Sequence, residues 1–154
     1  MAGTSSQNKG KEGEREVCDI LNGEIYNLLK ELGKPEEECR KAFSVVQRNQ
    51  NQSAVGGMDL TNTLGLAIEV KRQEALSVGS WWRQCLASAK RNDEVPVLIY
   101  RQNRKAWNIR TYGWINLPDG RQVRVEVEMD IASFRVWWRE WVRAKLATGE
   151  LLRT

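Results

Sequence analysis

The chain has 154 residues and a mass of 17.7 kDa, a size that suits one domain and is too short for two independent ones. Its 24 Lys and Arg residues against 20 Asp and Glu give a net charge of +4, which favours a polyanionic partner without requiring one. Histidine is absent, which excludes Ser-His-Asp and Cys-His catalysis, His-ligated zinc and any nuclease with a histidine base, so hydrolysis would have to use carboxylates, lysine and a hard metal ion.

Two further classes are disfavoured by the cysteines and by the hydropathy pattern. Cys18, Cys39 and Cys85 are scattered and form no Cys-x-x-Cys pair, so neither a disulfide framework nor a zinc ribbon is indicated. No apolar run approaches the length of a membrane span, and the first residues are polar rather than signal-like. We therefore expect a soluble cytoplasmic protein without a membrane partner.

The N-terminal third predicts one long helix and a short strand. Residues 1–8 are small and polar, which predicts a disordered lead-in before a single domain over 9–154. From Gly13 onward apolar residues recur at helical spacing, and Gly33 followed by Lys34-Pro35 ends the pattern. A short helical stretch over 36–43, a strand over 44–48 and a polar loop over 49–57 are expected next.

The remaining elements alternate strands and helices. The stretch 64–71 is apolar enough for a central strand, a helix is expected over 80–91, and 95–100 predicts a buried strand paired with 106–110. Pro118-Asp119-Gly120 indicates a turn before alternating valines over 123–129, and 131–147 predicts an amphipathic C-terminal helix. The order predicts an α/β domain with a mixed central sheet flanked by helices.

The pattern that carries chemistry is Asp59 followed ten residues later by Glu69-Val70-Lys71. Residues two apart on a strand share a face, so the Glu69 carboxylate and the Lys71 ammonium project side by side. Asp59 can bring a second carboxylate, and with the Val70 carbonyl this makes an all-oxygen site suited to Mg²⁺, for which Mn²⁺ could substitute. Lys71 would orient or deprotonate the attacking water, or stabilise charge on the phosphate.

Two alternatives stay open at this point. Glu69 and Lys71 could be an exposed strand pair with Asp59 in a turn, although a charged pair inside an apolar strand is costly unless it meets a metal or a partner. Glu14 falls within the apolar arc of the first helix, whereas Glu12 and Glu16 fall opposite. Its carboxylate could simply reach solvent, or it could enter the site as a third metal ligand.

The motifs together resemble archaeal-type Holliday junction resolvases and related phage PD-(D/E)XK endonucleases, over roughly Lys9 to Ile109. The resemblance is carried by these segments: Lys9-Gly10-x-x-x-Glu14-Arg15-Glu16, Val46-Gln47-Arg48, a Ser/Gly-containing loop, Asp59-Leu60, Ile68-Glu69-Val70-Lys71, and Pro96-Val97-Leu98 with Trp107. It implies a restriction-endonuclease-like fold and a metal-binding catalytic site of Glu14, Asp59, Glu69 and Lys71. It also implies phosphate contacts by Arg15 and Arg48, with Ser53 a loop match. The stretch from the first helix to Arg48 is longer than usual in the family, and residues 111–154 have no counterpart.

Basic residues outside the motifs suggest further DNA contacts. Arg135, Arg139 and Arg143 form a stripe on the last helix, which is either a solvated face or a contact for DNA phosphates. Lys9 and Lys11, near the start of the fold, are also expected to contact DNA. The tryptophans are interpreted as core or interface residues rather than stacking platforms for bases.

The function favoured by the sequence is a metal-dependent, structure-selective DNA endonuclease, most specifically a Holliday junction resolvase working in the cytoplasm, or in the host cytoplasm if a phage encodes it. Alternatives are another phage-type PD-(D/E)XK nuclease, sequence-specific or general, and a non-catalytic DNA-binding protein on the same scaffold. Two opposed incisions in a four-way junction need two sites, whereas one chain encodes one. A homodimer is therefore expected, with an apolar, tryptophan-rich interface formed partly by the last helix.

Overall fold

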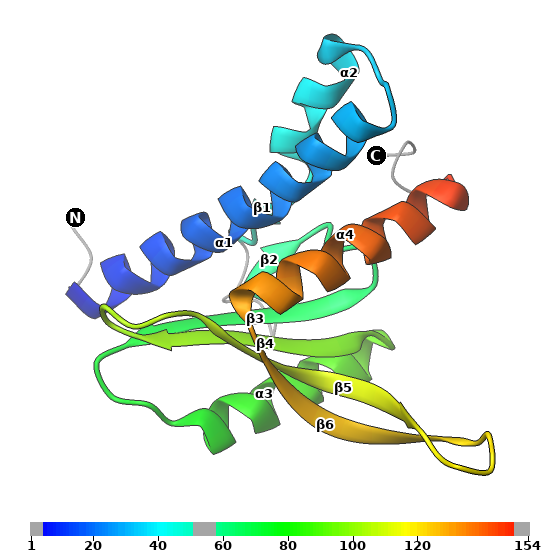
Figure 1. Cartoon of the computed structure of the whole chain (residues 1–154). Helices are drawn as coiled ribbons and strands as arrows, with labels where there is room; N and C mark the ends of the chain where they lie inside the picture. The colour runs from blue at the N-terminus through cyan, green and yellow to red at the C-terminus, as the bar shows by residue number, and fades with distance from the viewer. Residues whose placement is uncertain (1–4, 51–57, 150–154) are drawn as a thin grey trace.

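A twisted four-stranded mixed sheet organises the molecule, and the computed structural model describes residues 5–50 and 58–149 of it. The strands are β3 (Leu66–Gln73), β4 (Val95–Gln102), β5 (Asn108–Asn116) and β6 (Gln122–Asp130), hydrogen-bonded in that order. β3 and β4 run parallel, joined by helix α3 (Val78–Asn92), and the other neighbours are antiparallel. Helices α1 (Ser5–Glu31) and α4 (Ile131–Ala147) lie on one face of the sheet and α3 on the other (Figure 1). The predicted mixed sheet flanked by helices is confirmed.

Helix α1 is longer than its apolar repeat. The repeat is seen in full, with Val17, Leu21, Ile25 and Leu28 all buried. The C-terminal end is closed as predicted, because Gly33 takes a left-handed φ of +76° and the Lys34 N–H reaches back to the Leu29 carbonyl at 3.1 Å. The start was predicted too late: we placed residues 1–8 before the fold, but α1 begins at Ser5, and residues 1–4 lie outside the described part of the chain.

The segment after α1 contains less strand than predicted. It forms a short helix α2 (Glu36–Arg40), a 3₁₀ turn η1 (Lys41–Ser44), and only two strand residues, β1 (Gln47–Arg48). The expected strand over 44–48 is shorter because the Asn22 side chain on α1 takes both backbone groups of Val46. Its Oδ1 accepts from the Val46 N–H at 2.9 Å, and its Nδ2 donates to the Val46 carbonyl at 3.0 Å. Strand pairing, with β2 (Leu60–Thr61), therefore begins only at Gln47.

The bounds of the strands also differ from those predicted. β3 begins at Leu66 rather than residue 64, because Leu64 and Gly65 have φ of +56° and +95°, outside the extended region. β5 continues to Asn116, six residues past its predicted end. β4 pairs with β5 only as far as Thr111, so beyond that point β5 and β6 form a two-stranded arm that projects from the body (Figure 1).

The apolar core has two layers. The larger lies between the sheet and helices α1 and α4 and includes Leu21, Ile68, Ile99, Phe134 and Trp138; the smaller lies under α3 and includes Trp81, Trp82, Cys85, Leu98 and Tyr100. Trp138 is fully buried, and its Nε1 donates to the Leu21 carbonyl at 3.0 Å. Trp138 therefore belongs to the core, one of the two roles expected of the tryptophans, and the expected dimer surface stays a prediction. No helix within residues 5–50 and 58–149 is long and apolar enough to cross a membrane.

Candidate active site

The candidate site lies at β3, the edge strand of the four-stranded sheet, where Glu69 and Lys71 share one face as the period-two argument predicted. Glu69 is buried at 7% exposure, and its Oε1 accepts a 3.4 Å hydrogen bond from the Ser88 hydroxyl on α3. Lys71 is partly exposed. Burial of the Glu69 carboxyl excludes the alternative in which it is half of an exposed strand pair.

Asp59 is held against the outer edge of β3. Its Oδ2 accepts a 2.7 Å hydrogen bond from the backbone N–H of Val70. The N–H and C=O of one strand residue point to the same side, so the Val70 carbonyl also faces this edge. The short β1–β2 pairing supports the placement, because the Asn49 N–H donates to the Asp59 carbonyl at 2.9 Å. Asp59, Glu69 and the Val70 carbonyl are thus brought to one edge of the sheet.

The two carboxyl groups are electrostatically coupled. Burial, then the Asp59 charge and a hydrogen bond with its carboxyl group, raise the pKa of Glu69 to about 8. Burial also raises the pKa of Asp59, opposed by the Val70 N–H and the bond with Glu69. The charge of Lys71 favours ionisation of both. With its pKa raised to about 8, Glu69 is expected to keep its proton near neutral pH when no metal ion is bound.

Glu14 faces inward from α1, as the helical arc predicted, and is 7% exposed. Its Oε2 accepts a 2.8 Å hydrogen bond from Nε of Arg48 on β1. The alternative that Glu14 merely reaches solvent is excluded by this burial. Its charge also contributes to raising the pKa of Asp59, which places it in the same electrostatic environment as the β3 pair.

The structure also places Arg15 and Arg48 on a common surface. Arg15 is exposed one residue after Glu14, and both arginines line a depression of about 260 Å³ between α1 and β1. Asp19, Asn22 and Gln47 contribute to the same depression. The two arginines named as phosphate contacts therefore come together next to Glu14.

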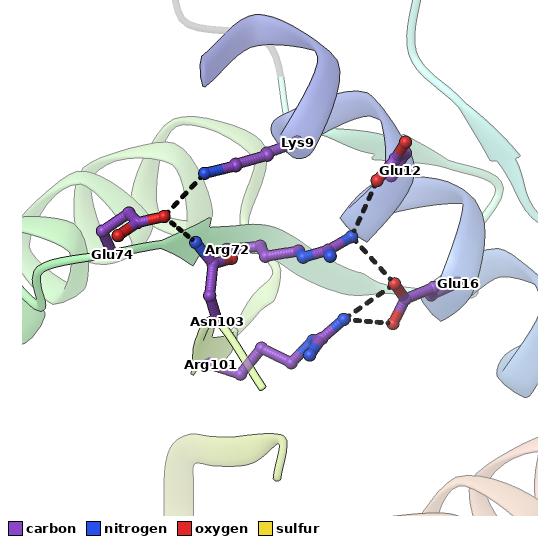
Figure 2. A network of polar contacts seen from close by, with 7 residues as sticks. All are labelled: Lys9, Glu12, Glu16, Arg72, Glu74, Arg101 and Asn103. Carbon is purple, nitrogen blue, oxygen red and sulfur yellow. Dashed lines mark hydrogen bonds and ion pairs between the residues drawn. The ribbon is translucent and has the colours of Figure 1, made fainter. Parts of the chain in front are cut away.

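A network missed by the sequence reasoning fastens α1 to the ends of β3 and β4 (Figure 2). Arg72 contacts Glu12 at 3.0 Å and Glu16 at 3.1 Å, and Arg101 contacts Glu16 at 2.8 Å. The helix approaches β3 closely here, since a Cβ on Gly13 would lie 3.1 Å from Cβ of Arg72. The only available signal was the spacing of Glu12 and Glu16, which places both on the face opposite the apolar arc. We call Arg72, Arg101, Glu12 and Glu16 the α1 clamp.

The remaining predicted DNA contacts are more dispersed. Lys9 is paired with Glu74 at 2.7 Å, and Lys11 is exposed. On α4, Arg139 is paired with Glu24 of α1 at 2.7 Å and Arg143 with Glu31 at 3.3 Å, while Arg135 is exposed. The stripe is thus partly a set of ion pairs between two helices. Ser53 lies outside the described residues.

The donor set suits a hard divalent cation. Asp59 and Glu69 supply oxygen donors only, the ligand type that hard divalent cations prefer. Within residues 5–50 and 58–149 no group of three or more His, Cys, Asp or Glu side chains is assembled for a metal ion. Glu14 is therefore not part of a preformed three-carboxylate cluster; two carboxylates and the Val70 carbonyl are the donors that the fold brings together.

Comparison with known proteins identifies one matching family. The model of the family described as "Phage putative PDDEXK endonuclease" matches residues 5–113, which contain every motif residue of the site. Among solved structures, Hjc from Archaeoglobus fulgidus, titled a Holliday junction resolvase from an archaeal hyperthermophile, is 17% identical and covers 82% of this chain and 95% of its own, with a TM-score of 0.40. No match was found among curated proteins.

Proposed function

Because the chain belongs to the phage PDDEXK endonuclease family, we propose that it is a Mg²⁺-dependent DNA endonuclease that selects branched DNA, most specifically four-way junctions. The family match and the mixed sheet flanked by helices together confirm the predicted PD-(D/E)XK fold class. Nucleases of this kind use divalent metal ions, and the proposal assigns that role to Mg²⁺, with Mn²⁺ as a substitute.

The single observation that carries the proposal is the buried Asp59–Glu69 pair beside Lys71. Burying two carboxyl groups in hydrogen-bond contact costs stability, a cost that a bound cation would offset. The other buried glutamates of known partner, Glu14 and Glu24, are each paired with an arginine. Glu69 lies instead beside Asp59 and Lys71, at the candidate site.

Each residue has a defined part in the proposed reaction. Asp59, Glu69 and the Val70 carbonyl would hold the cation, which when bound supplies Lewis acidity and a water of lowered pKa. Lys71 Nζ, on the same face as Glu69, donates a hydrogen bond to the attacking water or to a phosphate oxygen and so fixes its direction. Arg15 and Arg48 bind phosphates of the DNA in the depression that they line.

Glu14 is proposed as a further carboxylate of the working site. In the structure its charge is neutralised by Arg48 at 2.8 Å. A DNA phosphate competing for Arg48 would release Glu14 toward the cation, so that the carboxylate becomes available only when the substrate is in place. This links the phosphate contact to metal binding through one ion pair.

Junction resolution requires two incisions, and we propose a homodimer to supply them. The junction has near two-fold symmetry, each chain encodes one site, and a symmetric dimer presents two identical sites. A second candidate function is that of a nuclease of the same family that cuts linear duplex, either sequence-specifically or generally. It would use the same site residues. A non-catalytic DNA-binding role is disfavoured because Glu14, Asp59, Glu69 and Lys71 are all present.

The test offers four-way junctions, flaps, linear duplex and single strands side by side to the purified protein, with Mg²⁺, Mn²⁺ or EDTA. We expect cleavage of the junction in Mg²⁺ and none in EDTA, with Glu69→Gln as the matched inactive control. Equal cleavage of linear duplex would replace the resolvase by the general nuclease. Junction binding without cleavage in any metal would leave the non-catalytic alternative.

A further inference from the structure

The outer edge of β6 is an open strand edge in the described part of the chain. β6 pairs with β5 along its whole length, Gln122–Asp130, and is the last strand of the sheet. Its nine residues contain neither proline nor lysine, which commonly protect edge strands from pairing with another chain. Large apolar side chains on the arm are exposed, with Val123 at 43%, Ile115 at 51% and Trp114 at 53%. Residues beyond 113, which include most of this arm, also lie outside the family match.

We propose that two copies of this chain join edge to edge through β6, antiparallel, with Val125 on the two-fold axis. In this register Arg124 lies opposite Glu126 of the second copy, and by symmetry Glu126 lies opposite the second copy's Arg124. Val123 lies opposite Val127 of the second copy, and Gln122 opposite Glu128. Each charged pair is complementary, and the valines form one continuous apolar row on a single face.

Charge complementarity selects this register over its neighbours. Centring the pairing on Arg124 would place two arginines opposite each other, and centring it on Glu126 would place two glutamates opposite each other. Centring it on Val127 would place Glu126 opposite Glu128 twice. Like charges directly opposite are destabilising, so the register centred on Val125 is the one that the sequence of β6 supports.

Successive side chains of β6 point to opposite faces of the sheet. Val123, Val125 and Val127 share the face that carries Met129, which packs against the core of α1 and α4. Arg124 and Glu126 share the opposite face, where the Arg124 guanidinium lies 4.3 Å from the ring centroid of Tyr112. The apolar row would therefore extend the α1–α4 core layer across the two-fold axis, while the charged pairs stay at the exposed face.

The β6 dimer would fix where the two active sites lie relative to each other. Its role in junction cleavage rests on the proposed function. Antiparallel pairing within one sheet has its two-fold axis normal to the sheet, so both copies present the same face to the same side. The two β3 strands become the outer edges of an eight-stranded sheet, seven strand spacings or roughly 34 Å apart before twist. Two active sites would thus face one DNA substrate from one side.

The test measures mass in solution, without DNA or metal, by sedimentation equilibrium. Wild type is expected to give a mass near twice 17.7 kDa. Arg124→Glu and Glu126→Arg each place like charges opposite each other, so each should raise the dimer dissociation constant at least tenfold. The double swap Arg124→Glu/Glu126→Arg restores complementarity and should return most of the affinity. Arg83→Glu on α3, an exposed position with the same charge change, is the matched control.

Cross-linking between the two copies tests the register of the β6 pairing. Val125→Cys places one thiol from each copy across the axis, with Cβ atoms about 4.5–5.5 Å apart. Mild oxidation or a short bis-maleimide should then join the two copies. The three native cysteines are all buried and do not compete.

The outcomes separate the inference from the nuclease function. A wild type that stays monomeric, or a dimer whose affinity the charge reversals and the Arg83→Glu control change equally, overturns the β6 interface. Failure of Val125→Cys to cross-link in a dimeric sample overturns the register. Because mass is measured without substrate, either result leaves cleavage to be judged separately, and loss of cleavage with an intact β6 dimer would count only against the nuclease proposal.

Discussion

Oδ2 of Asp59 accepts the backbone N–H of Val70 at 2.7 Å, which fastens the loop before β2 to the edge of β3. The hydrogen bond to Val70 thus positions Asp59 through one of its oxygens. The side chain of Asp59 also forms a hydrogen bond with that of Glu69. The same side chain serves the fold and the proposed chemistry. This relationship dictates which substitutions separate the two roles, because an amide keeps an oxygen acceptor and loses the charge.

Asp59→Asn, Glu69→Gln and Lys71→Ala are each expected to reduce junction cleavage by roughly a hundredfold or more while the protein stays folded and binds DNA. The physical reason is that each change removes a cation ligand or the group that directs water, without removing apolar packing. Single-turnover kinetics measure the loss of cleavage. A gel-shift measurement in Ca²⁺ checks that DNA binding is kept. Normal cleavage by any of the three variants would remove that residue from the site.

The pKa of Glu69 predicts how metal-free stability depends on pH. In the folded chain this pKa is raised to about 8 from 4.5. Below pH 4.5 the group is protonated in both states. Between about 4.5 and 8 the unfolded chain loses the proton and the folded chain keeps it, so the free energy of unfolding falls as pH rises. Above about pH 8 the group is ionised in both states, and the free energy of unfolding falls no further on its account.

Glu69→Gln should therefore melt higher than wild type in EDTA at pH 8, with the difference vanishing toward pH 5. The expected gain is on the order of a few kcal/mol at most, because the carboxyls are coupled and relax. Mg²⁺ should raise the melting temperature of wild type at pH 8 and not that of the variant. Parallel melting curves across pH would show that Glu69 is ionised in the metal-free fold.

Local patterns anticipated much of this site, and long-range contacts account for what they missed. Glu69 and Lys71 follow from strand period, and inward-facing Glu14 from helical period, because both patterns are set by neighbours a few residues apart. The shortening of β1 depends on Asn22, and the α1 clamp joins residues 56 and more apart in sequence. No local pattern encodes which chain segment will meet such a side chain, so these features appear only in the folded structure.

The Glu14–Arg48 ion pair predicts a distinctive double variant. Arg48→Gln removes the ion pair of a buried carboxylate and should cost about 1–3 kcal/mol of stability. Adding Glu14→Gln should restore most of that stability, because two neutral amides can hydrogen-bond. If Glu14 serves the cation, the double variant stays inactive. Recovery of cleavage together with stability would show that the glutamate is only structural.

The arginines of α4 are expected to separate into two kinds. Arg139→Gln breaks the ion pair with Glu24 and should lower the melting temperature with little effect on DNA affinity. Arg135→Gln should leave melting unchanged and, if this exposed arginine meets a phosphate, reduce the slope of log affinity against log salt by about 1. Binding titrations over a salt series distinguish them. An unchanged slope for Arg135→Gln would leave Arg135 as a solvated side chain of the helix.

The α1 clamp predicts an effect on the active site from residues that touch neither metal nor DNA. Arg72 and Arg101 converge on Glu16, two residues beyond Glu14 on the same helix (Figure 2). Loosening the clamp should let this turn of α1 shift relative to β3, where Gly13 makes its close approach to Arg72. We therefore expect Arg72 and Arg101 to act as positioning residues for Glu14.

Arg72→Met keeps the apolar stem of the side chain and removes both ion pairs with α1. The expected result is a kcat for junction cleavage lowered roughly tenfold with KM for DNA little changed, because a misplaced carboxylate affects the reacting centre more than substrate binding. Mn²⁺ affinity, measured by calorimetry, should weaken in parallel, and Arg72→Lys should recover part of both. Lys105→Met, an exposed residue of the β4–β5 turn, is the matched control. A variant that melts earlier but keeps wild-type Mn²⁺ affinity and kcat would reduce the clamp to ordinary helix packing.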